Sequence, residues 1–150
     1  MRFGPLALKS TFALNNVGID TNVFNANDVD QPQSDFTMTF TPMTDVWLRM
    51  GRTWISGQID VDWVYYRRFA SERSANSDYR INVARTFNRL ALNGAARRLS
   101  TRERPGFEID ARSQRLETEL DGNVEMRVMA KTFVGAKAWR RRMTFDRFAV

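Results

Sequence analysis

Carboxylates spaced two residues apart are the side chains of this sequence most able to do chemistry. Asp60 and Asp62 form one such pair, and Glu108 and Asp110 form another. Residues i and i+2 of a β-strand project from the same face, so each pair could act as an acid and a base. The arginines that could form ion pairs with these carboxylates across a sheet are Arg80, Arg97, Arg112 and Arg127. We expect structural ion pairs rather than catalysis, and therefore no enzyme.

Two residue types that often carry chemistry do not occur in the sequence. The chain has no cysteine and no histidine, which excludes thiol chemistry, disulfides, the usual zinc sites and a Ser-His-Asp triad. The segment from Asp20 to Asp30 is rich in Asp and Asn oxygens, but it lacks the glycine and the distal glutamate of an EF-hand loop. We therefore expect no metal and no cofactor.

The charge of the chain is basic and is carried almost entirely by arginine. Lysine and arginine total 23 against 17 acidic residues, for a net charge of +6, and 20 of the 23 cations are arginine. The planar guanidinium group suits two-pronged contact with phosphate or carboxylate. Nucleic acid, lipid phosphate and acidic glycans are the candidate partners, and a set of solvated surface charges is the alternative.

Alternation of apolar and polar residues predicts long β-strands. In "SGQIDVDWVYY" the apolar residues Ile59, Val61 and Trp63 alternate with Asp60 and Asp62. The segments "DFTMTFTP" and "DYRINV" follow the same rule. A period of two gives each strand one apolar and one polar face.

A short pattern occurs three times between these segments, as "MGRTWI" (50–55), "FNRLAL" (87–92) and "MAKTFV" (129–134). Each copy centres on a cation, Arg52, Arg89 or Lys131. We interpret the copies as the short turns of successive β-hairpins. A helix over "NVARTFNRLALNGAARRL" is the alternative, but Asn88 and Gly94 weaken it.

These signals predict an all-β, up-and-down antiparallel meander of about seven long strands. The expected spans are 5–19, 35–50, 53–66, 77–88, 91–102, 107–129 and 133–145. The longer connections fall at 20–34, 67–77 and 101–106. Most of these strands exceed the five or six residues usual in soluble sheets and suffice for a tilted membrane crossing.

Aromatic residues gather near the expected strand ends. Near the long connections lie Phe24, Phe36, Tyr65, Tyr66, Phe69, Tyr79 and Phe107. Nearer the short turns lie Trp47, Trp54, Phe87, Phe133 and Trp139. Two aromatic bands, short turns on one side and long loops on the other are typical of outer-membrane β-barrels. Rings that fill a soluble barrel or sandwich are the alternative.

An ordered set of segments also resembles a known family. "VGIDTNVFN", "SDFTMTFTP", "YYRRFASERS" and "TRERPGFEIDARS" follow one another along the chain. Together they resemble porin-like outer-membrane β-barrel proteins of Gram-negative bacteria. The resemblance implies a larger barrel with an envelope role near the export of surface polysaccharide, and it implies no catalytic residue. No signal sequence is recognisable, and the end "TFDRFAV" lacks a terminal aromatic residue. With an odd number of expected strands, these features predict a fragment of a barrel.

We therefore expect residues 1–150 to form one segment of a transmembrane β-barrel in the outer membrane, as a porin-like channel or structural envelope protein. The expected partners are membrane lipid, lipopolysaccharide and a small solute or polysaccharide, without nucleic acid. The candidate lumen-facing residues are Asp60, Asp62, Arg80, Asp110 and Arg112. The candidate contacts to lipopolysaccharide at the rim are Arg67, Arg68, Arg102 and Arg104. A soluble basic β-protein that binds nucleic acid is the alternative.

Overall fold

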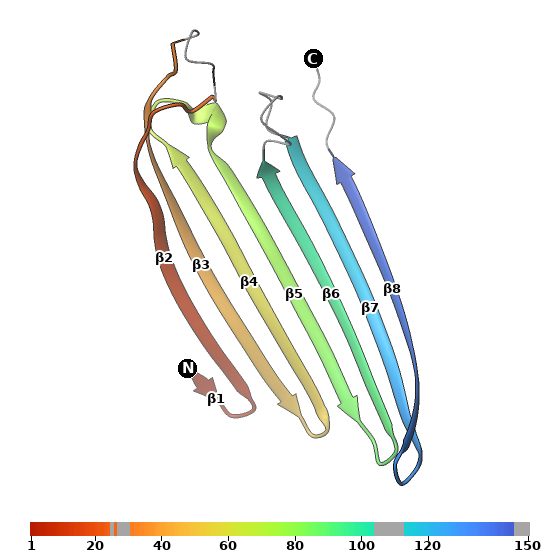
Figure 1. Cartoon of the computed structure of the whole chain (residues 1–150). Coiled ribbons are helices and arrows are strands. Elements are labelled where there is room, and N and C mark those ends of the chain that lie inside the picture. Colours follow the sequence, from red (N-terminus) through yellow and green to blue (C-terminus); the bar gives the residue numbers. More distant parts are fainter. Residues whose placement is uncertain (25, 27–30, 104–112, 146–150) are drawn as a thin grey trace.

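The chain forms one antiparallel sheet in which each strand pairs with the next one along the sequence (Figure 1). The computed structural model describes residues 1–24, 26, 31–103 and 113–145. Its elements are β1 Arg2–Phe3, β2 Leu6–Asp20, β3 Asp35–Met50, β4 Thr53–Tyr66, the 3-10 turn η2 Ala70–Glu72, β5 Ser74–Thr86, β6 Leu90–Glu103, β7 Ser113–Met129 and β8 Thr132–Phe145. The predicted all-β meander is confirmed.

The structure differs from the predicted strands mainly at two places, and a third lies outside the described residues. A two-residue strand, β1, precedes the first predicted strand, because Gly4 adopts a φ of +58° and turns the chain back so that Phe3 pairs with Leu6. The described sheet therefore has eight strands and not seven. Strand β5 begins at Ser74, so the connection after β4 is shorter than predicted. The start predicted for the next-to-last strand, at 107, lies outside the described residues.

The three repeated segments are tight turns, as predicted. Met50 pairs with Thr53 around Gly51 and Arg52, and Met129 pairs with Thr132. The turn between β5 and β6 holds a hydrogen bond from the backbone N–H of Phe87 to the carbonyl of Leu90 at 2.7 Å. Gly51 has a φ of +60°, a conformation that glycine adopts without a steric cost. All three turns lie at one end of the sheet, and the long connections lie at the other (Figure 1).

The register gives the sheet one polar and one apolar face. Among the strand residues whose side chains are described, every Asp and Glu lies on the polar face: Asp20, Asp35, Asp45, Asp60, Asp62, Asp78, Glu117, Glu119, Asp121 and Glu125. The apolar face carries large side chains such as Phe12, Phe40, Trp63, Ile81 and Leu120.

Burial shows which way the sheet curls. Polar-face residues at or near the long-connection ends of their strands, such as Thr39, Thr101 and Glu117, are at most 8% exposed. Ile81 and Trp63 on the apolar face are 49% and 52% exposed. Side chains crowd together on the inside of a curved sheet and spread apart on its outside, so the sheet curls toward its polar face.

The described chain has almost no conventional core. Val23 and Tyr66 are its only buried hydrophobic residues. No second layer from the described residues covers the apolar face. Large exposed apolar patches usually mark contact with a membrane or another protein. Within the described chain, no helix is long and apolar enough to cross a membrane.

Candidate functional site

An ion-pair network crosses the polar face from β5 to β8. Arg80 and Arg97 both contact the Asp78 carboxylate, each at 2.7 Å. Arg97 continues to Glu119 at 3.8 Å. On β8, Arg141 lies 3.3 Å from Glu119. The network arises because the alternation places these residues on one face and the register stacks them on adjacent strands.

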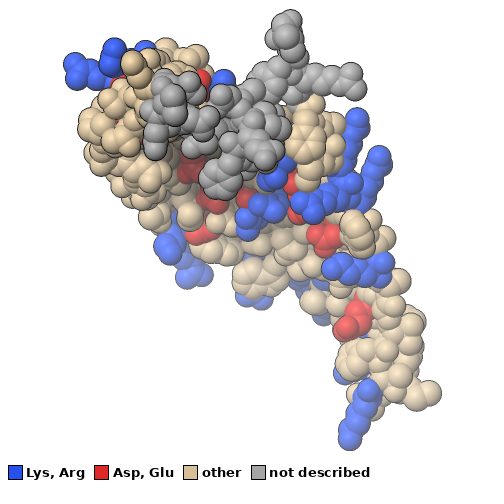
Figure 2. Space-filling model, turned by 45° about the horizontal axis from the view of Figure 1, so that its top comes forward, with Lys and Arg blue, Asp and Glu red and all other residues tan. Residues whose placement is uncertain are grey.

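A second carboxylate extends the network toward the long connections. Glu117 on β7 contacts Arg141 at 2.6 Å and Arg115 at 4.0 Å, and its side chain is only 3% exposed. Basic and acidic side chains therefore alternate across the polar face, and they lie next to one another in the view of Figure 2. The polar face therefore carries charges of both signs close together.

The carboxylate pair Asp60 and Asp62 lies on this face but outside the network. Asp62 accepts a hydrogen bond from the hydroxyl of Thr41 at 2.6 Å. One oxygen of Asp60 is buried without a hydrogen-bond donor, and the residue lies opposite Asp78 on β5. The arginine expected to pair with it, Arg80, binds Asp78 instead. The two carboxylates therefore have different surroundings, and Asp60 has a like charge as its neighbour.

An open cavity of about 550 Å³ lies beside the network. Its lining includes Trp47, Gln58, Arg80, Arg97 and Asp121. An aromatic ring, an amide and charges of both signs surround it.

The rim at the long-connection end is braced by side chains that bind backbone groups. The Asp35 carboxylate accepts hydrogen bonds from the backbone N–H groups of Arg68 and Phe69, at 2.8 and 3.0 Å. The Arg102 guanidinium donates to the carbonyls of Ser71 and Arg73, at 2.8 and 3.3 Å. These contacts tie the start of β3 and the end of β6 to the segment around η2.

The structure places the predicted site residues in different settings. Asp60, Asp62 and Arg80 share the polar face. Arg67 and Arg68 are exposed at the rim, whereas the guanidinium of Arg102 is held by loop carbonyls. The other predicted residues, Asp110, Arg112 and Arg104, lie outside the described residues, as does Glu108.

Sequence reasoning did not single out Asp78, Glu117, Glu119 and Arg141, which form the centre of the network. Alternation alone could have assigned them to the polar face. Their pairing depends on which residues of adjacent strands lie opposite each other, and a pattern with a period of two does not contain that information.

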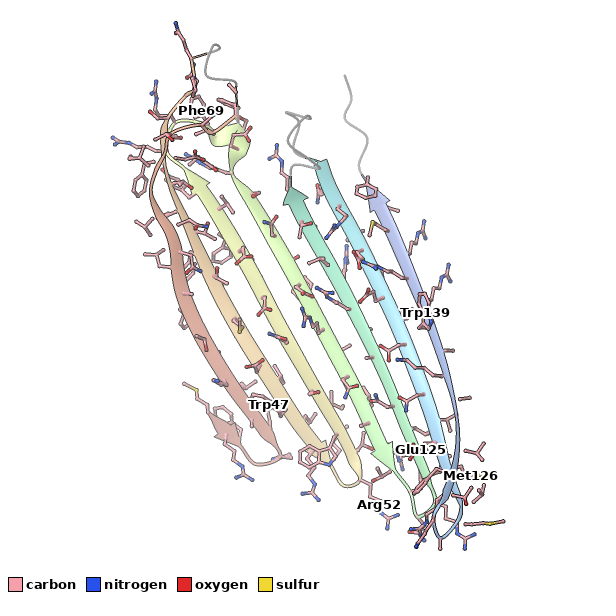
Figure 3. The ribbon with its side chains drawn as sticks, in the orientation of Figure 1. Trp47, Arg52, Phe69, Glu125, Met126 and Trp139 are labelled. Carbon is pink, nitrogen blue, oxygen red and sulfur yellow. The ribbon has the colours of Figure 1, made fainter. Side chains whose placement is uncertain are left out.

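The aromatic residues are arranged differently from the two simple bands that were predicted. Phe12, Phe40 and Trp63 stack in a row on the apolar face, with ring centroids 6.1 and 5.7 Å apart. Trp47 lies at the short-turn end and Phe69 at the long-connection end, as predicted (Figure 3). Trp139 lies well inside β8 and not near its turn, opposite Asp121 on the polar face.

Comparison of the chain with family models, with curated proteins and with solved structures gives no match.

Proposed function

We propose that this chain forms part of the wall of an outer-membrane β-barrel, with its apolar face in lipid and its polar face lining an aqueous lumen. One observation carries the proposal: all the described carboxylates of the strands occupy the face that is inside the curve, and most of the large exposed hydrophobic side chains occupy the outside. The exceptions, such as Trp47, Trp54 and Trp139, are on the polar face. A soluble sheet of this kind would need a second layer over its apolar face. Lipid supplies that cover in a membrane barrel.

The dimensions of the strands support the proposal. Strands β2 to β8 contain between 13 and 17 residues. At about 3.3 Å per residue, the shortest of them is roughly 43 Å long. A strand of that length, tilted by about 40°, crosses the apolar band of about 25 Å and reaches both interfaces.

The charged wall supports a porin-like channel or structural envelope protein as the specific role. The cavity beside Arg80 and Arg97 would offer a small polar solute both charges and a tryptophan surface. The segregation of faces disfavours a soluble nucleic-acid binder. On the polar face, Arg80, Arg97 and Arg141 are bound to carboxylates and are therefore not free to grip the phosphates of a nucleic acid.

Cysteine labelling in cells that make the protein tests the proposal, since the chain has no native cysteine. Single variants Ser71→Cys, Arg52→Cys and Lys131→Cys place a thiol at one long connection and at two short turns. Long loops face outward and short turns face the periplasm in known outer-membrane barrels. An impermeant maleimide should therefore label Ser71→Cys in intact cells and should label the two turn variants only after the outer membrane is opened.

The opposite result would also be informative. If all three thiols react only after lysis, and the protein stays in solution without detergent, the membrane proposal is wrong. A soluble protein that loses bound oligonucleotide as salt rises would then support the nucleic-acid alternative.

A further inference from the structure

Five arginines of the described strands lie on the apolar face, where those strands place no described carboxylate, and three of the five form a cluster. The other two, Arg85 and Arg102, lie near opposite ends of their strands. Arg98 of β6 and Arg142 of β8 flank Thr118 in one row across the sheet. Arg140 lies in the next row, beside Leu120. All three are exposed, and no carboxylate of the described residues pairs with them. Their sequence neighbours Arg97 and Arg141 point to the polar face and are fully engaged there.

An open groove of about 510 Å³ lies next to these arginines. Ile81, Val83 and Leu120 line it, together with Arg140 and a floor of residues with small side chains or none. Asp121 and Trp139 also contribute to the lining, although the register places both residues on the polar face. The floor residues are Gly94, Ala96, Gly122 and Ala138. Large apolar side chains beside a shallow floor form a surface on which a hydrocarbon chain can lie.

The groove and the arginines are arranged in a fixed order along the strands. Gly94 and Ala138 lie nearest the short turns, Ala96 and Arg140 lie one row higher, and Arg98 lies in the row above them with Arg142. The apolar end of this surface therefore points toward the short turns, and its cationic end points toward the long connections. The surface complements an amphiphile with an anionic headgroup.

The cost of burying charge supports the same assignment. An arginine on the lipid face of a barrel is costly at mid-membrane and costs little near an interface. Three unpaired arginines within two rows therefore favour a place near an interface, where the anionic headgroups of lipids can meet them. Phosphate is the anion that a guanidinium group binds with two parallel hydrogen bonds.

We propose that this surface binds a phosphorylated lipid, with one acyl chain in the groove and its phosphate against Arg98, Arg140 and Arg142. This inference rests on the proposed function, which places the long connections outside the cell. The phosphorylated lipid of that leaflet is the lipid A part of lipopolysaccharide. The site differs from the rim arginines predicted from the sequence, one of which, Arg102, is held by loop carbonyls.

Binding of purified lipid A to the protein in zwitterionic detergent micelles tests the proposal. One variant combines Arg98→Gln, Arg140→Gln and Arg142→Gln. Its matched control combines Arg52→Gln, Arg89→Gln and Lys131→Gln, which removes the same charge at the short turns. Because it loses the charged hydrogen bonds to the phosphate, the first variant should bind lipid A at least about tenfold more weakly. The control should bind it as the wild type does.

Two further measurements separate a lipid from a free anion. Dephosphorylated lipid A should bind the wild type at least about tenfold more weakly than lipid A, and inorganic phosphate should not compete. Ala96→Leu fills the groove without touching the charges and should also weaken lipid A binding. Circular dichroism of each variant checks that it is folded.

The inference is overturned if the first variant binds lipid A as tightly as the wild type, if the control loses as much affinity, or if inorganic phosphate displaces the lipid. These failures are distinct from a failure of the proposed function. A protein that passes the cysteine labelling but shows no preference for lipid A remains a barrel without this site. A protein that is soluble without detergent refutes the barrel itself.

Discussion

At the scale of single residues, the polar face contains two carboxylates with opposite surroundings. Asp78 on β5 is held by Arg80 and Arg97, whereas Asp60, which lies opposite it on β4, has a buried oxygen without a donor. A buried acceptor without a partner costs stability, and a like charge beside it adds to the cost. The surroundings of Asp78 therefore stabilise its carboxylate, whereas those of Asp60 destabilise a chemically identical group.

We expect Asp60→Asn to leave the free energy of unfolding unchanged or to raise it, because the substitution removes a negative charge that has like charges around it and a buried oxygen without a donor. Asp78→Asn should lower the free energy of unfolding by about 1–2 kcal/mol, because it weakens two charged hydrogen bonds on a partly exposed surface. Urea unfolding of both variants in detergent micelles measures the difference. An equal loss in the two variants would contradict the network as described.

At the scale of elements, the hairpins depend on the turns that join them. Gly51 is the first residue of the two-residue turn between β3 and β4 and has a φ of +60°. Residues with a Cβ atom pay about 1–2 kcal/mol in this region. Glycine occurs only in this copy of the sequence repeat. Asn88 and Ala130 occupy the corresponding position in the other two turns.

We expect Gly51→Ala to lower the free energy of unfolding by about 1 kcal/mol. Gly57→Ala is the matched control, because Gly57 lies inside β4 at a negative φ and a Cβ atom there would be 3.4 Å from its closest neighbour. The control should change stability less than the turn variant does. Urea unfolding of the two proteins under the same conditions provides the comparison, and a larger loss in the control would show that the turn is not strained by alanine.

At the scale of the whole molecule, the apolar face must be covered by something other than the described chain. Two adjacent residues of β4, one on each face, can be used to test what covers the apolar face. Ile59 is 44% exposed on the apolar face, and Gln58 is on the polar face beside Arg80. If lipid covers the first face and water the second, the same substitution has different consequences at these two positions.

We expect Ile59→Arg to reduce the amount of protein inserted into the outer membrane, because a cation on the lipid face of a barrel costs about 2–4 kcal/mol near mid-membrane. Gln58→Arg should insert normally, because its side chain lies on the polar face, which the proposed function exposes to water. The yield of folded protein in the outer-membrane fraction is the measurement. Equal insertion of both variants would mean that the face of Ile59 is not in contact with lipid.

Much of the fold could be predicted because strand periodicity is a local property. The spans predicted at 35–50 and 53–66 coincide with β3 and β4, and the three repeated segments form tight turns. The short strand β1 was not predicted, since two residues are too few to show a period. The aromatic pattern placed Trp139 near a turn, but the register places it opposite Asp121, inside the strand.

The candidate site was less accessible to sequence reasoning than the fold. The polar face of Asp60, Asp62 and Arg80 follows from alternation. The choice of partners does not, because moving one strand by two residues keeps every side chain on its face and changes every pair across the sheet. The pairing of Asp78 with Arg97 therefore could not be predicted from either strand by itself.

The sequence by itself determined the all-β meander, the positions of the turns and the two faces of each strand, because apolar periodicity and turn residues act over a few neighbouring positions. Only the tertiary structure decided which face curls inward, which arginines find carboxylates and which remain on the apolar face beside the groove. These features depend on register, which the turns set between neighbouring strands, with local irregularities between Asn15 and Gly18 and between Arg127 and Met129. Contacts between strands are long-range in sequence, so no local pattern contains them.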